Sequence, residues 1–405
     1  MNIFYKFYCR CYQTIFKLMI PFMPYKNPII KNSLLDIKDI IKKHNIKSPL
    51  IITDKVILNN GLLKPLLDDL KEHNISYVLY DEVLPNPTNS SIEDLYLKLK
   101  DSSIDMLIAV GGGSVIDFAK GFGIKLVKPN KSLNKFKGVL KVRKRLPLFV
   151  ASPTTAGTGS EVTITTVITD PIKEYKFTIN DFNLMPKYAV LDANLLEKLP
   201  SHLVATTGMD ALTHAVEAFI GRSTTKETRK ASIDAVKLIY ENLENAVVNK
   251  DLKAKENMLH ASYYAGIAFR KSYVGYVHAL AHAIGGKYHL AHGYTNSIIL
   301  PIMLKRYGKS VYKKLAILAR ESNLVNKDID NESAANIFID WINCLNSKFN
   351  IPHFIKEINE SDLEQIAKNA SKEANPLYPV PLLLSKKDLK ECLEKISNRK
   401  NLSNN

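Results

Sequence analysis

The sequence predicts two domains of different class, an α/β domain built on a parallel sheet and an all-α domain. Short apolar runs alternate with helical segments in the first half of the chain, which is typical of βαβ units. Beyond about residue 199 the periodicity is helical and strand signals are scarce. With 405 residues, 46% of them hydrophobic, the chain can bury two cores. We expect an N-terminal extension (1–28), the α/β domain (29–199) and the helical domain (200–405).

Four strands are predicted in the α/β domain, and residues that suit a ligand follow each of them. The strands are expected at 49–53, 76–80, 105–110 and 148–151, with helices at 62–72 and 92–100. After them come Asp54, Asn86, the glycine triplet 111–113 and the loop 153–160. Open parallel sheets bind ligands beyond the carboxyl ends of their strands, so these residues indicate a binding site along that edge.

The segment 111–120, GGGSVIDFAK, joins a predicted strand to a helix expected to begin at Ser114. Glycines let backbone N–H groups approach a ligand, and a helix N-terminus suits a pyrophosphate. The segment is neither a P-loop nor the usual dinucleotide fingerprint, because Ile116 stands at the third glycine position. Taken by itself, the motif fits equally well a tight turn with a capping box of Ser114 and Asp117.

Asp54 and the threonine-rich loop 154–159 indicate the kind of nucleotide. A carboxylate at the end of the first strand can accept hydrogen bonds from ribose hydroxyls and repels a 2′-phosphate, which favours NAD over NADP. The alternative for Asp54 is an ordinary Asx turn. The loop offers the hydroxyls of Thr154, Thr155 and Thr158, which is more than a simple turn requires.

Candidate metal ligands recur at four-residue spacing in the helical domain. Asp210 and His214 lie in the segment 208–219, GMDALTHAVEAF, which we interpret as the start of a helix. His278 and His282 repeat the spacing on a second helix. Residues four apart share one helix face, so each pair can offer two ligands to one ion.

Two further histidines are candidate metal ligands, and one glutamate is a candidate support for a ligand. His289 and His292 are expected on a loop, because Gly285 and Gly286 should end the preceding helix. Oxygen and nitrogen donors without sulfur suit Fe(II), Zn, Co or Mn. The spacing does not decide which of the four later histidines bind the metal. Glu217 is either a support for a ligand or a solvated helix charge.

Composition narrows the class of protein. The net charge is +16, but no run of five basic residues occurs, so a nucleic-acid partner is not expected. The four cysteines are not spaced as a disulfide framework or a cysteine zinc site, which favours a reducing, cytoplasmic setting.

The N-terminal segment 1–23 is apolar and aromatic, but Lys6, Arg10 and Lys17 interrupt it. No apolar run reaches the roughly 18 residues of a spanning helix. We therefore expect an amphipathic helix that packs its apolar stripe on the protein. The less favoured alternative is a helix that contacts a membrane surface or a partner protein.

The motifs at 111–120, 153–163, 208–219 and 277–293 together resemble those of the iron-containing (group III) alcohol dehydrogenase family, over about residues 51–301. This resemblance implies a dehydroquinate synthase-like architecture and a metal, Fe(II) or else zinc, on Asp210, His214, His278 and His292. It implies that His282 lies beside the substrate and takes part in proton transfer. The residues that it implies for dinucleotide binding are Asn86, Gly112, Gly113, Ser114, Asp117, Thr154, Thr155, Thr158 and Lys176.

Two departures from the family pattern stand out. Ala291 replaces a usual proline before His292, which is expected to loosen the loop that carries this ligand. The N-terminal segment is not part of the common pattern.

The resemblance implies reversible hydride transfer between a primary alcohol or its aldehyde and NAD, in a homodimer. The metal is expected to act as a Lewis acid on the substrate oxygen. The alternatives are a zinc-dependent polyol dehydrogenase or an NAD-using cyclase of the same fold, a metal-dependent hydrolase with structural glycines, and a non-catalytic nucleotide-binding module held on a membrane by the N-terminal segment.

Overall fold

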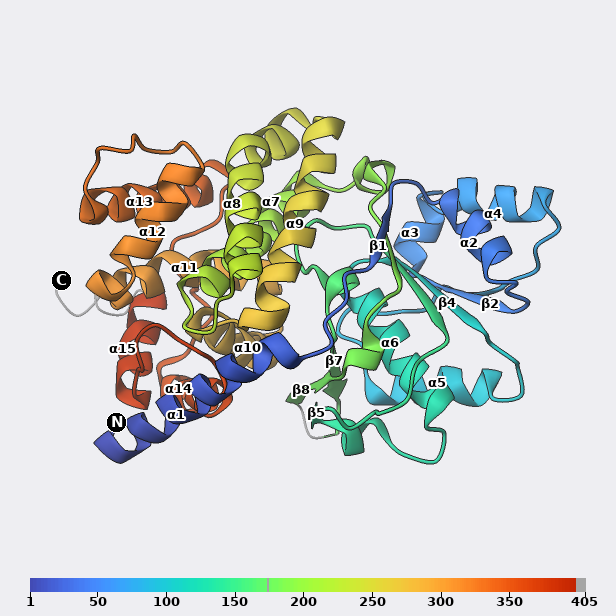
Figure 1. The fold of residues 1–405 in the computed structure, drawn as a ribbon, viewed down its shortest axis with the longest axis horizontal. Coiled ribbons are helices and arrows are strands. Elements are labelled where there is room, and N and C mark those ends of the chain that lie inside the picture. The colour runs from blue at the N-terminus through green and yellow to red at the C-terminus, as the bar shows by residue number, and fades with distance from the viewer. Residues whose placement is uncertain (173–174, 398–405) are drawn as a thin grey trace. The chain divides into compact units, whose positions relative to one another are not determined.

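The computed structural model describes residues 1–172 and 175–397, and the chain divides into two units. The first is an α/β unit over Pro24–Pro200. The second is helical and joins Met1–Met23 to the chain from Ser201 onward, so the two ends of the sequence belong to one unit (Figure 1). The predicted fold class, a parallel α/β part followed by a helical part, is confirmed.

The α/β unit is built on a parallel sheet in the order β1-β9-β6-β4-β2-β3. Its strands are β1 (Ile29–Lys31), β2 (Pro49–Ile52), β3 (Val78–Tyr80), β4 (Met106–Gly111), β6 (Leu148–Pro153) and β9 (Tyr188–Val190). Every residue of β2 and β4 is buried, which explains why these strands read as continuous apolar runs. The four expected strands are β2, β3, β4 and β6, whereas β1 and β9 were not among them.

Helices connect the strands. They are α2 (Asp36–Lys43), α3 (Lys55–Asn59), α4 (Lys64–Glu72), α5 (Asn89–Leu99) and α6 (Gly113–Val127), with short 3-10 turns at Leu133–Phe136, Ser160–Val162, Phe182–Leu184 and Ala193–Leu196. Phe118 and Phe122 of α6 are buried in one core cluster with Leu107 of β4. Gly112 is the N-cap of α6, so the helix begins one residue earlier than expected.

A second, smaller sheet was missed by the sequence analysis. Its strands are β5 (Gly138–Val139), β7 (Thr165–Asp170) and β8 (Tyr175–Asn180), in the order β5-β8-β7, and β7 and β8 are antiparallel. Along β7 buried and half-buried residues alternate. Such a strand gives a weaker signal than the apolar runs of the main sheet.

The helical unit contains all the predicted metal ligands. Its helices are α1 (Ile3–Met19), α7 (Ser201–Ile220), α8 (Lys226–Glu244), α9 (Leu252–Ser272), α10 (Tyr276–Tyr288), α11 (His292–Tyr307), α12 (Tyr312–Glu321), α13 (Asn331–Lys348), α14 (Leu363–Ala374) and α15 (Lys386–Ile396). Shorter turns lie at Ile20–Phe22, Asn245–Asn249, Gly308–Ser310 and Glu360–Asp362. Helices α7, α8 and α9 pack on one another.

Two helix boundaries predicted from glycines were wrong. Helix α7 begins at Ser201, so Gly208 lies inside it. A Cβ at Gly208 would lie 2.3 Å from Leu243 Cδ1, so the glycine permits close packing of α8. Helix α10 runs through Gly285 and Gly286, because tertiary packing outweighs the low helix propensity of glycine.

Helix α1 forms as expected but packs with the opposite side. Cys9 and Gln13 are buried, whereas Phe4 and Phe7 are 80% and 72% exposed. The prediction that its apolar stripe faces the protein was therefore wrong. Among the described residues, no helix is long and apolar enough to cross a membrane.

Candidate metal centre and cofactor-binding edge

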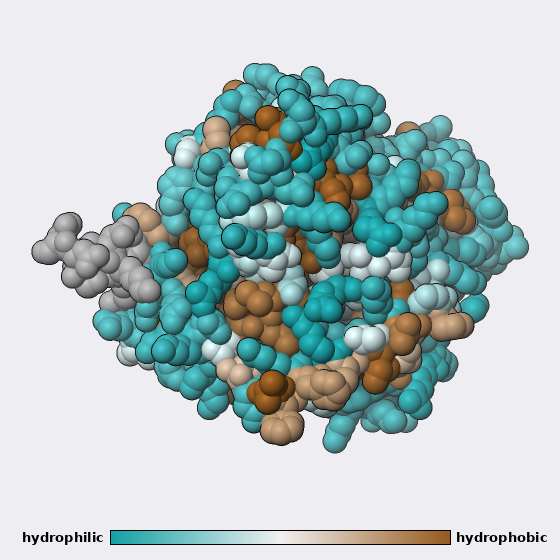
Figure 2. Space-filling view, turned by 60° about the vertical axis from the view of Figure 1, so that its left-hand side comes forward, coloured by the Kyte–Doolittle hydropathy of each residue, from teal (hydrophilic) through white to brown (hydrophobic). Residues whose placement is uncertain are grey.

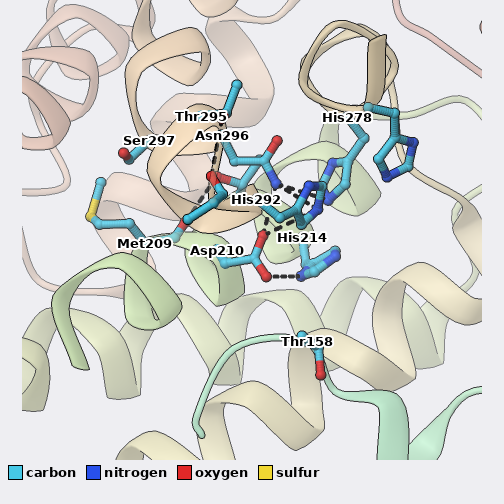
Figure 3. A network of polar contacts seen from close by, with 12 residues as sticks. Thr158, Met209, Asp210, His214, His278, His292, Thr295, Asn296 and Ser297 are labelled. Carbon is cyan, nitrogen blue, oxygen red and sulfur yellow. Dashed lines mark hydrogen bonds and ion pairs between the residues drawn. The ribbon is translucent and has the colours of Figure 1, made fainter. Parts of the chain in front are cut away.

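Side chains from three helices converge in the helical unit (Figure 3). Asp210 and His214 come from α7, His278 from α10 and His292 from α11. One potential ligand atom of each lies within 4.8 Å of the others. Nε2 of His292 is 3.7 Å from Oδ1 of Asp210, and Nδ1 of His214 is 4.0 Å from Oδ2. The structure thus brings together the ligand set that the resemblance implied.

A close approach of two helices makes this convergence possible. A Cβ at Gly293 would lie 2.3 Å from the backbone oxygen of Thr206, so only glycine lets α11 begin against α7. His292 is the first residue of α11, not a loop residue as predicted. Ala291 occupies the N-cap position of this helix.

The donor set fits a divalent metal ion. One carboxylate and three imidazoles without sulfur suit Fe(II) or Zn. Asp210, His214 and His278 are buried. Burial, together with the neighbouring histidines, lowers the pKa of His278 well below its usual value. Its imidazole is therefore neutral, the form that binds a metal.

Two of the candidate histidines are not members of this cluster. His282 stacks on His292, with ring centroids 5.0 Å apart, and its Nδ1 lies 2.7 Å from Oε1 of Glu373. His289 is exposed and ends α10 in the left-handed conformation. The sequence spacing did not show which of the four histidines belong to the ligand cluster, whereas the tertiary structure does.

In the α/β unit, the candidate cofactor residues follow strands that are neighbours in the sheet. The order β6-β4-β2-β3 places the carboxyl ends of these four strands side by side. The order of connections reverses between β2 and β4, and open sheets bind ligands at such a point. Asp54 follows β2 and accepts a hydrogen bond from the backbone N–H of Ile57, so it caps α3.

Three candidates from different parts of this unit are in direct contact. Nζ of Lys176, on β8, donates to Oδ1 of Asn86 over 2.7 Å. The backbone N–H of Asn86 donates to Oγ of Ser114, at the start of α6, over 3.3 Å. Burial lowers the pKa of Lys176. These contacts hold a cation and a helix N-terminus together, a combination that suits a phosphate group.

The glycines of α6 pack against the threonine loop. A Cβ at Gly112 would lie 3.7 Å from Oγ1 of Thr155, and one at Gly113 would lie 2.8 Å from Cγ2 of Thr158. Thr154 is buried, and its backbone N–H donates to the oxygen of Gly111. The loop and the helix N-terminus therefore form one surface.

Asp117 has a structural role in this arrangement. Its carboxylate accepts hydrogen bonds from Oγ of Ser160 and from the backbone N–H of Val167, so it ties α6 to the loop and to β7. Burial raises the pKa of Asp117 to about 6. The hydrogen bonds of the Asp117 carboxylate are therefore not those of the predicted capping box with Ser114.

Comparison with known proteins identifies the family. Residues 27–193 match the family model of the iron-containing alcohol dehydrogenases, and residues 204–397 match the C-terminal model of the same family. The chain belongs to the iron-containing alcohol dehydrogenase family.

Named relatives agree with this membership. The NAD-dependent methanol dehydrogenase of Bacillus methanolicus is 33% identical over 355 residues, which are 86% of this chain and 92% of that protein. The 1,3-propanediol dehydrogenase of Citrobacter freundii is 36% identical over 334 residues, 81% of this chain and 86% of that one. The structure of an alcohol dehydrogenase from Oenococcus oeni superposes with a TM-score of 0.86 at 32% identity, covering 92% of this chain and 100% of that one.

The predicted enzyme class is thereby confirmed, and this member of the family is a metal-dependent alcohol dehydrogenase. Relatives named as dehydrogenases do not favour the hydrolase alternative, and the match to a family of iron-containing enzymes does not favour the zinc-dependent polyol dehydrogenase. The presence of an NAD-dependent enzyme among them supports NAD as the cofactor.

Four residues with clear roles in this dehydrogenase were missed or left undecided by the sequence analysis. Nδ2 of Asn296 lies 2.7 Å from Oδ1 of Asp210, 3.0 Å from Nε2 of His292 and 3.3 Å from Nε2 of His278. Asn296 is fully buried, and its amide group contacts atoms of three proposed ligands. Because it follows His292 by four residues, the spacing rule used for the other pairs could have found it.

Glu217 supports His278, so the interpretation as a solvated charge is excluded. Its Oε2 lies 2.6 Å from Nδ1 of His278 and also accepts the backbone N–H of Gly275, while Oε1 accepts that of Val277. Burial raises the pKa of Glu217 to about 7, and these backbone donors lower it. A carboxylate on Nδ1 leaves Nε2 as the ligand atom of the ring.

Glu373 and Lys120 complete the set. Glu373, on α14, accepts a hydrogen bond from the hydroxyl of Tyr378 and contacts His282. No feature of the sequence around Glu373 indicates this contact.

Lys120 is fully buried, and its Nζ lies 2.7 to 3.2 Å from five oxygens of residues 160–165. It therefore fastens residues 160–165, which directly follow the threonine loop, to α6.

Proposed function

We propose that this chain catalyses reversible hydride transfer between a primary alcohol and its aldehyde, with NAD as the acceptor and donor. The proposal assigns Fe(II), with zinc as the alternative, to Asp210, His214, His278 and His292. The observation that carries it is the convergence of one carboxylate and three imidazoles within 4.8 Å. When bound, the ion supplies Lewis-acid stabilisation of a developing alkoxide, and the dinucleotide carries the hydride.

The chain itself contributes position and protonation states. Glu217 orients His278 through Nδ1, Asn296 donates to Oδ1 of Asp210, and a neutral imidazole at His278 can offer the lone pair of Nε2 to the ion. A prearranged ligand set needs little rearrangement when it binds metal. These residues therefore set the affinity and the geometry of the metal centre.

We assign proton transfer to His282. It lies beside the ligand set without belonging to it, and Glu373 contacts its Nδ1. If Nδ1 carries the proton toward this carboxylate, Nε2 is the basic atom, which is the arrangement that a general base needs. The half-exposed position of the ring gives it access to solvent.

The dinucleotide is assigned to the carboxyl edge of the sheet. Lys176 and the N-terminus of α6 suit its phosphates, and Asp54 suits an adenosine ribose. The residues proposed to contact it are Asp54, Asn86, Gly112, Gly113, Ser114, Asp117, Thr154, Thr155, Thr158 and Lys176. Of these, Asp54 and Asp117 also make internal contacts, so their substitution would perturb α3 or the threonine loop as well.

Two histidine variants test the proposal by separating metal binding from proton transfer. His214→Ala should lose bound iron, measured by elemental analysis after anaerobic purification, and should lose turnover while still binding NADH by fluorescence. His282→Ala should keep its iron and NADH but lose about a hundredfold or more in kcat. The exposed His353 provides a matched control, and His353→Ala should match the wild type in all three measurements.

Distinct results would contradict distinct parts of this proposal. Turnover at the wild-type rate in iron-free His214→Ala would exclude the metal role. Loss of iron in His282→Ala would make His282 a ligand instead of a proton-transfer residue. No NADH fluorescence change in any of the proteins would exclude the dinucleotide.

The homodimer and the cytoplasmic location expected from the sequence also belong to this proposal. Four cysteines that form no disulfide agree with a reducing compartment. Light scattering by the purified protein and fractionation of cells test the two expectations.

A further inference from the structure

Helix α1 turns a continuous apolar face away from the protein. The large apolar residues on this face are all at least 50% exposed: Ile3, Phe4, Phe7, Tyr8, Ile15, Leu18 and Met19. Figure 2 shows hydrophobic side chains gathered in a band low on the visible face, over α1. Exposed apolar surface of this extent on one helix marks a contact site.

Polar contacts fix the helix in this orientation. The guanidinium of Arg10 donates to the backbone oxygens of Val380 and Pro381, and the amide of Gln13 donates to that of Tyr378. The ring of Phe16 packs edge-on against Tyr273, with centroids 5.0 Å apart. The side chains that attach α1 are therefore distinct from its apolar face, which remains available.

The helix is an addition to the family fold. The family model begins to match at residue 27, after α1 has ended. The dehydrogenase site that this family shares does not include α1, so the exposed face needs an explanation of its own.

The charges on α1 are all positive. The helix carries Lys6, Arg10 and Lys17 and no aspartate or glutamate. Lys6 and Lys17 are exposed, next to the apolar face. Lys17 is also near the cations Arg222, Arg229 and Lys314 of the helical unit, since burial and the charges of Lys17, Arg222 and Arg229 lower the pKa of Lys314 to about 8.

We propose that α1 docks this dehydrogenase on an anionic lipid bilayer, lying in the interface with its apolar face in the membrane. An amphipathic helix with bulky apolar side chains on one side and lysines beside them binds such surfaces. Tyr5, Tyr8 and Tyr12 add aromatic rings that favour the headgroup region. Docking by α1 requires no spanning helix.

Charge favours this occupant over a second copy of the chain. Two α1 helices packed together would bring lysines close to one another, with no carboxylate on either helix to pair with them. An anionic bilayer attracts the same lysines, by about fivefold in partition for each charge near the surface.

Vesicle flotation with the full-length, iron-loaded protein tests the proposal. The protein should float with vesicles that contain phosphatidylserine and much less with phosphatidylcholine alone, and added salt should weaken the binding. Phe4→Ser combined with Phe7→Ser should lower the partition coefficient by roughly tenfold or more. Lys6→Gln combined with Lys17→Gln should reduce the difference between the two kinds of vesicle.

A matched control removes apolar side chains that are exposed elsewhere. Leu97 on α5 and Ile337 on α13 are 56% and 41% exposed, and their combined change to serine should leave flotation unchanged. Alcohol oxidation at the wild-type rate and an unchanged helical circular dichroism signal would show that each variant is folded.

Three outcomes would overturn the proposal. The first is no flotation of the wild type with either vesicle. The second is undiminished flotation of the phenylalanine variant, which would assign binding to another surface. The third is a smaller particle by light scattering in the phenylalanine variant without vesicle binding by the wild type, which would make α1 a contact between protein chains.

Discussion

The carboxylate of Glu217 lies 2.6 Å from Nδ1 of His278, and both side chains are buried. The same carboxylate accepts backbone N–H groups from Gly275 and Val277 at the start of α10. One side chain on α7 therefore fixes both the N-terminus of α10 and the orientation of a metal ligand on it. Removing the charge of Glu217 should therefore weaken metal binding, although all four ligand residues are kept.

Glu217→Gln should lower iron affinity by about ten- to a hundredfold, the usual effect of removing the carboxylate partner of a ligating histidine. The glutamine keeps the size of the side chain but offers a weaker acceptor to His278. Competition with a chelator under anaerobic conditions measures the affinity. Glu227, an exposed residue paired with Lys271, provides the control as Glu227→Gln. Equal affinities in both variants would show that Glu217 is not a support of the ligand.

Lys176→Met should weaken NADH binding by about tenfold, because it removes a charge-assisted contact with an anionic ligand. It should also release Asn86, whose Oδ1 accepts the Lys176 ammonium group. Titration followed by NADH fluorescence gives Kd, and elemental analysis should show unchanged iron. The exposed Lys135 serves as the control, as Lys135→Met. If both lysine variants weaken binding equally, the effect is one of net charge and not of the site.

Glu161→Gln should stabilise the protein at pH 7 but hardly at pH 4. Glu161 is 1% exposed, and burial raises the pKa of its carboxyl to about 7. Among the described residues, neither carboxylate oxygen has a hydrogen-bond partner. Below the unfolded pKa of about 4.5 the carboxyl is neutral in both states. As pH rises to about 7, only the unfolded state loses the proton readily, so wild-type stability falls.

Glutamine is neutral throughout this range and should remove the loss, by about 3 kcal/mol at most. The measurement is the difference in Tm between variant and wild type, which should grow from near zero at pH 4 to almost its full value at pH 7. Other titrating groups cancel in this difference except Lys120, since burial lowers its pKa to about 8 while the charge of Glu161 acts to raise it. The exposed Glu72, changed to glutamine, should give no such trend. A constant difference across the range would mean that Glu161 does not titrate between these pH values.

Much of the fold was predictable because its signals are local. The strands β2 and β4 are buried on both faces, so their sequences are apolar without interruption. The half-buried strands β7 and β8 lack that signal and were missed. Helix boundaries were predicted wrongly at glycines, since Gly208 lies inside α7 and Gly285 lies inside α10. Helix propensity describes an isolated segment, whereas a close neighbour decides whether the helix continues.

The sequence by itself determined the class of the protein, the four-residue spacing of its candidate ligands and the loops that follow the strands. These depend on periodicity and residue chemistry, which neighbouring residues in the chain carry. Only the tertiary structure decided that His292 joins the ligand set while His282 turns to Glu373, and that α1 attaches by Arg10 and Gln13 with its aromatic face outward. Those outcomes depend on contacts between residues 80 to 370 positions apart, and no local pattern records which distant partner a side chain will meet.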